Sequence, residues 1–120
     1  MSTQIEFKKI CNSVLNTDDS IRFVGLISEG GKLLESIRRQ NLHRFLTVEE
    51  EDLSFIQAAM KSKMSKLWDD KLGKTKWTID LKEKVKLITI FLDSKYLVLS
   101  TETIADHEKI ITKIQDVLLA

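Results

Sequence analysis

The sequence predicts a single α+β domain, residues 1–120, in which a five-stranded sheet lies between helices in three α/β/α layers. Three predicted strands carry large apolar side chains on both sides of the pleat: residues 21–27, 85–92 and 96–101. Two others have a more polar second face: residues 32–38 and 74–82. Strands that are apolar on both faces are covered above and below, so they belong in the middle of a sheet, and the wetter strands belong at its edges.

The composition is that of a soluble globular protein and excludes several classes. Nineteen basic and eighteen acidic residues nearly cancel, whereas nucleic-acid binders carry a basic excess. The single cysteine, Cys11, rules out an internal disulfide and favours a reducing compartment. The N-terminus lacks a signal-peptide pattern and no apolar run reaches membrane-spanning length, so we expect a cytoplasmic protein without a membrane partner.

The first predicted helix covers residues 3–15. Thr3 and Glu6 have the spacing of a capping box, and apolar residues recur at helical intervals behind them. The turn-forming residues at 16–19 end this helix.

A hairpin is predicted next, from strands at residues 21–27 and 32–38. The turn between them contains Gly30 and Gly31, and glycine tolerates the positive φ that such turns require. A loop of undefined shape, residues 39–46, follows.

The longest predicted helix covers residues 47–72. Thr47 and Glu50 again have capping-box spacing, and Gly73 is placed to end the helix. Large apolar residues recur at helical spacing, and we expect them to face the core: Leu53, Ile56, Met60, Met64, Leu67 and Trp68.

Three strands and a last helix complete the chain. Residues 74–81 alternate, residues 85–92 are apolar on both faces, and residues 96–100 follow a second short turn. The last helix is expected to begin after Thr103.

The element order is therefore α-β-β-α-β-β-β-α. Short turns make both hairpin pairings antiparallel. The strand order that keeps these pairings and leaves strands two and three at the edges is 2-1-5-4-3. The long helix then covers one face of the sheet and the two terminal helices cover the other.

This order of elements, with the hairpin at Gly30-Gly31 and the long middle helix, resembles the profilin-like folds, and most closely the roadblock/dynein light-chain family. Gly25 and the pair Ala58-Ala59 loosely match the family's small-residue positions. The chain also resembles small archaeal proteins of this length, a likeness that implies no function. The roadblock resemblance implies a non-enzymatic homodimer that pairs through the middle helix and third strand and acts as a scaffold or a regulator of small GTPases.

A dimer surface is predicted on the side of the long helix opposite its apolar stripe. This side carries small residues and one aromatic: Phe55, Ala58, Ala59, Ser62 and Ser65. On the neighbouring edge strand, antiparallel self-pairing centred near Thr78 would set Lys76 opposite the partner's Asp80. The alternative is a solvated helix face beside an edge that is guarded by charge.

Two further sites are weaker interpretations. A small-ligand sensory domain of the profilin or PAS type would need a cavity, for which the large adaptable side chains are Met60, Met64, Trp68, Trp77 and Tyr96; such sets more often fill a core. An anion or acidic partner could contact the basic cluster at Arg38, Arg39, His43 and Arg44, although ordinary surface charge is the better interpretation.

No catalytic or metal site is predicted, and no cofactor. His43 and His107 lie far apart and Cys11 stands alone, whereas zinc needs about four ligands at recognisable spacing. The carboxylates at 49–52 and 69–70 lie at opposite ends of one helix and cannot form an acid–base pair.

Overall fold

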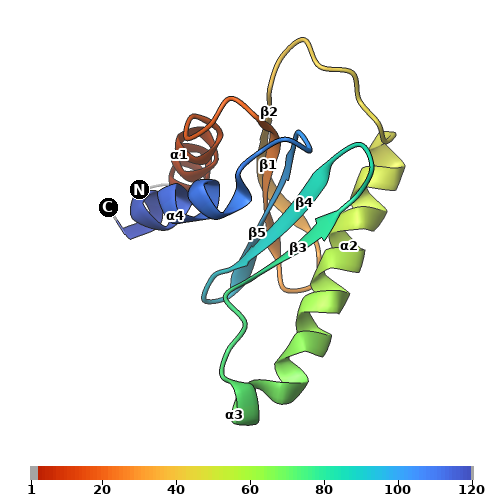
Figure 1. The fold of residues 1–120 in the computed structure, drawn as a ribbon. Helices are drawn as coiled ribbons and strands as arrows, with labels where there is room; N and C mark the ends of the chain where they lie inside the picture. Colours follow the sequence, from red (N-terminus) through yellow and green to blue (C-terminus); the bar gives the residue numbers. More distant parts are fainter. Residues whose placement is uncertain (1–2, 120) are drawn as a thin grey trace.

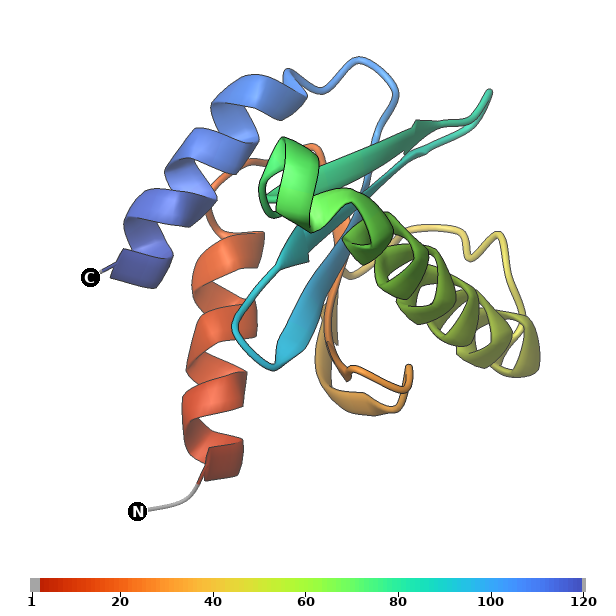
Figure 2. The same ribbon diagram turned by 90° about the horizontal axis from the view of Figure 1, so that it is seen from below.

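The computed structural model describes residues 3–119 and has the three predicted layers (Figure 1). Helices α1 (Thr3–Leu15) and α4 (His107–Leu119) cover one face of the sheet. Helix α2 (Val48–Ser65) lies on the other face, and the view from below shows it well separated from α1 and α4 (Figure 2). None of the helices in the described part of the chain has both the length and the apolar character needed to cross a membrane.

The sheet has the predicted strand order. Its strands are β1 (Ile21–Ser28), β2 (Leu33–Arg38), β3 (Trp77–Leu81), β4 (Lys86–Phe91) and β5 (Lys95–Thr101). They are arranged β2-β1-β5-β4-β3 and every pairing is antiparallel. The pair that is distant in sequence, β1 with β5, places Gly25 opposite Val98. Strands β2 and β3 lie at the two edges, as their polar second faces predict.

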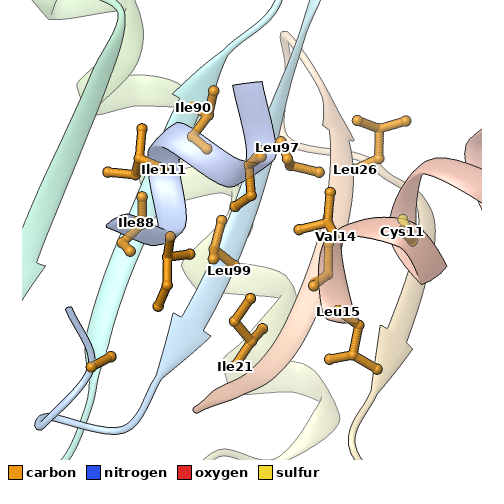
Figure 3. Packing of buried hydrophobic residues seen from close by; sticks show 14 residues of the cluster. Cys11, Val14, Leu15, Ile21, Leu26, Ile88, Ile90, Leu97, Leu99 and Ile111 are labelled. Atoms are coloured by element: carbon orange, nitrogen blue, oxygen red, sulfur yellow. The ribbon is translucent and has the colours of Figure 1, made fainter. Parts of the chain in front are cut away.

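The larger part of the core lies between the sheet and the two terminal helices. In Figure 3 the labelled side chains of α1 and α4 gather over those of β1, β4 and β5. Ile88 and Ile90 of β4 belong to this cluster and are buried. The other face of β4 is covered less than predicted, because α2 packs over β1 and β5 instead: Leu87 is 37% exposed.

The ends of the long helix differ in how well they were predicted. The capping box is present, since the Thr47 side chain accepts from the Glu50 N–H at 3.1 Å and the Glu50 carboxylate accepts from the Thr47 N–H at 2.8 Å. The predicted helix over 47–72 is interrupted, however. A 3-10 turn, η1 (Lys66–Trp68), separates α2 from the short α3 (Asp69–Leu72), and Gly73 ends α3 with a φ of 85°.

The side of α2 that packs on the sheet is the opposite of the predicted one. Phe55, Ala59 and Ser62 are at most 4% exposed, whereas the predicted core stripe faces outward. The Phe55 ring stacks on Phe23 of β1, with centroids 5.8 Å apart. The prediction of an exposed Phe55, Ala59 and Ser62 is therefore wrong.

Close approach of the backbones explains why the small side of α2 faces inward. The turn between β1 and β2 presses on α2 at Gly31, where an added Cβ would lie 2.7 Å from the Cα of Ile56. Small side chains such as those of Ala59 and Ser62 allow a helix to sit this close to a sheet, and long side chains are then forced to the outside.

Candidate interaction surface and the adjoining groove

Helix α2 and η1 expose a row of large apolar side chains on the face that points away from the sheet. We call it the outer stripe. Its six side chains are 44% to 74% exposed: Leu53, Ile56, Met60, Met64, Leu67 and Trp68. Contiguous exposed apolar surface of this kind marks interaction sites in soluble proteins.

An open strand edge lies next to this helix. Within residues 3–119, β3 pairs with β4 alone, so its outer backbone groups face away from the sheet. Helix α2 runs beside this edge (Figure 1), and Lys61 on α2 binds both carboxylate oxygens of Asp80 on β3 at 2.8 Å. This ion pair connects α2 to β3, and because both side chains are exposed it contributes little stability.

The residues predicted for a dimer surface are divided by the structure. Ala58 and Ser65 are half-buried, and the hydroxyls of Ser62 and Ser65 donate to carbonyl oxygens within α2. The buried Phe55, Ala59 and Ser62 cannot reach a partner unless α2 leaves the sheet, whereas Ala58 and Ser65 keep part of their surface exposed. Lys76, Thr78 and Asp80 do lie along the β3 edge, but Asp80 is already engaged by Lys61 of the same chain.

The five residues predicted to line a ligand pocket do not meet. Trp77 packs on the face that α1 and α4 cover and lies edge-on to His107, with ring centroids 6.2 Å apart. Tyr96 is buried on the opposite face of the sheet. Met60, Met64 and Trp68 belong to the exposed outer stripe. This pocket prediction is wrong because alternate residues of neighbouring strands point to opposite faces of the sheet.

A real hollow lies elsewhere on the α2 side, between α2, the loop at 39–46 and the strands β3, β4 and β5. Its volume is about 520 Å³. The floor includes the short side chains of Thr78, Thr89 and Ser100 together with apolar ones such as Leu87 and Val98, and Ser54 and Ala58 bound the groove on the α2 side. Sequence analysis missed this groove. The available signal was Thr89, a short polar residue on the α2-facing side of β4 between Ile88 and Ile90, which pairs with another short polar residue, Thr78, on β3.

The predicted basic cluster is only partly available at this groove. The Arg39 guanidinium donates to the carbonyl oxygens of Ile21, Leu15 and Asp18, at 2.7 to 3.0 Å, and so fastens β2 to the end of α1. Arg38, His43 and Arg44 line the groove instead. The structure therefore separates Arg39 from the other three.

Cys11 has the character of a packing residue. Burial raises the pKa of its thiol to about 11, and the negative charge of Glu35 adds to the effect. A thiol with this pKa is protonated at neutral pH and is a poor nucleophile.

The chain is similar in fold to several solved structures. No family model matches the chain, and no curated protein does. A gliding protein, MglB, from Thermus thermophilus superposes with a TM-score of 0.79 at 14% identity, over 97% of this chain and 86% of that one. An MglB structure described as having a tetrameric arrangement gives the same TM-score and identity, over 97% of this chain and 85% of that one.

A Roadblock/LC7 domain from Streptomyces avermitilis superposes with a TM-score of 0.68 at 10% identity, over 92% of this chain and 93% of that one. These likenesses cover nearly the whole chain. The chain therefore has the Roadblock/LC7 fold, as its order of elements predicts.

Proposed function

We propose that this chain is a non-enzymatic, homodimeric interaction module in which two copies associate through the outer stripe and the β3 edge. The observation that carries the proposal is the outer stripe, where six large apolar side chains are exposed on one helical face beside an open strand edge. Burying such a face is the main driving force of most protein associations.

Charge along α2 favours a second copy of the chain as the occupant. The first turn carries Glu49 and Glu50, whereas Lys63 and Lys66 lie at the other end, and none of these four takes part in a salt bridge within residues 3–119. When two such helices lie antiparallel, the acidic end of each faces the basic end of the other. Two parallel copies would set like charges against each other, so these charges favour the antiparallel orientation.

The role that follows from the roadblock resemblance is regulatory or scaffolding, in the cytoplasm, with a small GTPase as the class of partner. The Roadblock/LC7 fold supports this role. We place the GTPase contact on the assembled dimer, because the outer stripe is used in forming it.

The test is the mass in solution of a matched pair of variants. Wild-type protein is expected to have twice the chain mass of 13.8 kDa by size-exclusion chromatography with light scattering. Met64→Asp places a charge in the middle of the outer stripe, where the side chain is 74% exposed, and should yield a folded monomer. Ile5→Asp makes the same kind of change on exposed α1 and should leave the dimer intact.

A monomeric wild-type protein at tens of micromolar would refute the dimer. If Ile5→Asp dissociated the dimer and Met64→Asp did not, the interface would lie on α1 and our assignment to α2 would be wrong. Binding of a purified small GTPase to the wild type and not to Met64→Asp is the result expected if the assembled dimer is the regulatory unit.

A further inference from the structure

We propose that the groove between α2 and strands β3 to β5 binds a small organic anion, a carboxylate or phosphate carried on a polar body. The groove is built within one chain, and the inference stands independently of self-association. Its volume of about 520 Å³ is in the range of small-molecule sites, which are commonly about 300–1,000 Å³.

Several short side chains lie on the floor of the groove and on the α2 side that faces it. On the floor, Thr78 lies opposite Thr89, and on the neighbouring row Leu87 lies opposite Ser100. On the α2 side, Ser54 and Ala58 complete the boundary. Large apolar residues fill the equivalent layer on the other face of the sheet, where α1 and α4 pack tightly.

The floor presents hydrogen-bonding groups that the protein itself does not use. Within residues 3–119, the hydroxyls of Thr78, Thr89 and Ser100 make no hydrogen bond to another protein group, and the same is true of the Gln57 amide. A hydroxyl both donates and accepts, and an amide does the same. A ligand with hydroxyl or carbonyl groups would satisfy them, whereas a purely apolar ligand would leave them unpaired at a cost.

Charge at one end of the groove selects for an anion. Arg38 and Arg44 both bind the single carboxylate of Glu51, so two guanidinium groups share one negative charge. Arg44 makes two long contacts, to Glu51 at 3.5 Å and from its Nε to the Leu46 carbonyl oxygen at 3.4 Å. Its side chain is 41% exposed, so its other N–H groups remain for a ligand. Arginine binds carboxylate and phosphate in a bidentate manner, which makes Arg44 the expected contact.

The remaining charges orient the ligand. Lys61, at the β3 side, is neutralised by Asp80 at 2.8 Å. Arg22 is paired with Glu102 at 2.7 Å and also donates to the His43 carbonyl. Lys82 also lines the groove, at the turn after β3, and is in no salt bridge within residues 3–119. Positive charge therefore lies at Lys82 and beside the loop at 39–46, where Arg38 and Arg44 share one carboxylate. We place the anionic group beside this loop, with the polar body extending over the floor.

The experiment is a titration of ¹⁵N-labelled protein with citrate, adenosine monophosphate and inorganic phosphate, followed by NMR. We expect citrate or the nucleotide to shift resonances of β3, β4 and the Arg44 side chain. Arg44→Gln should weaken binding about tenfold or more, the loss of one charge-assisted hydrogen-bonding group. Thr89→Leu fills the floor and should abolish binding while leaving the protein folded. Lys9→Gln, on exposed α1, is the matched control and should bind as wild type.

Several outcomes overturn the proposal. One is the absence of shifts at millimolar citrate and nucleotide; another is shifts that Arg44→Gln and Thr89→Leu leave unchanged. If inorganic phosphate bound as tightly as citrate and the nucleotide, the polar body of the ligand would make no contact, and the proposal of an organic ligand would be wrong.

Met64→Asp separates this proposal from the dimer, since Met64 does not line the groove. Retained binding in that variant supports a site within one chain, and loss of binding in the folded variant refutes it.

Discussion

Replacing Phe55 with alanine tests which face of α2 holds the domain together. Phe55 is 4% exposed and stacks on Phe23, so its removal loses a buried aromatic contact and leaves a cavity. Losses of this kind cost about 3–5 kcal/mol. We expect the lower part of that range, about 3 kcal/mol, because the adjoining groove gives neighbouring side chains room to relax.

Met64→Ala is the matched comparison, because Met64 lies two and a half turns further along the same helix and is 74% exposed. In the monomer its removal should change the free energy of unfolding by no more than about 0.5 kcal/mol. If the outer stripe is a dimer contact, the effect of Met64→Ala should grow with protein concentration. The effect of Phe55→Ala should persist under dilution.

The assay is urea-induced unfolding followed by circular dichroism at several protein concentrations. Phe55→Ala is expected to lower the midpoint with an unchanged slope against urea, which reports a loss of stability rather than a change of the unfolded state. If Met64→Ala costs as much as Phe55→Ala in dilute protein, or if Phe55→Ala changes the mass and leaves the stability unaltered, the assignment of the two faces is wrong.

Three further predictions concern other parts of the chain. Gly31→Ala should strongly destabilise the domain, because Gly31 has a φ of 91° and an added Cβ would meet the backbone of Ile56 at 2.7 Å; wild-type stability on thermal unfolding would contradict this. Cys11, with its pKa raised to about 11 by burial, should react with a thiol reagent at pH 8 far more slowly in the native protein than in denaturant, and equal rates would contradict its placement. Hydrogen bonds from the Ser20 hydroxyl and backbone N–H lower the pKa of Asp18 in the folded protein. The ionised carboxylate therefore stabilises the fold fully above the unfolded pKa of about 3.9. This contribution is lost as the pH falls through the lower pKa of the folded state. Ser20→Ala should therefore reduce stability at neutral pH, and its difference from wild type in urea titrations should shrink in acid; a constant difference would refute the link.

Local sequence was sufficient for the elements and their order because each carries its own signal. The capping box at Thr47 and Glu50 marks the start of α2, and alternation marks β3 as an edge strand. Strands that are apolar on both faces had to be central, which left one arrangement of the sheet. The sequence predicted the ends of the helices less well. The predicted helix over 47–72, for example, is interrupted at Lys66–Trp68, where the chain forms the 3-10 turn η1.

The periodicity of the sequence could not predict which side of α2 packs on the sheet. Both sides of this helix have a regular pattern, one of large side chains from Leu53 to Trp68 and one of smaller ones with Phe55. Burial of large apolar groups favours the first, and this preference predicts the wrong face. Contact between Gly31 and the Ile56 backbone requires the second, and that contact joins residues distant in sequence.

The outer stripe and the groove depend differently on sequence and on tertiary structure. From the sequence alone came a five-stranded sheet with two covered faces, an edge at β3 and a long helix beside it. Only the tertiary structure decided that the large side chains of that helix face outward and that short residues leave a groove beneath it. The physical reason is that spacing along one chain records which residues share a face, whereas the distance between two backbones determines which face can be buried.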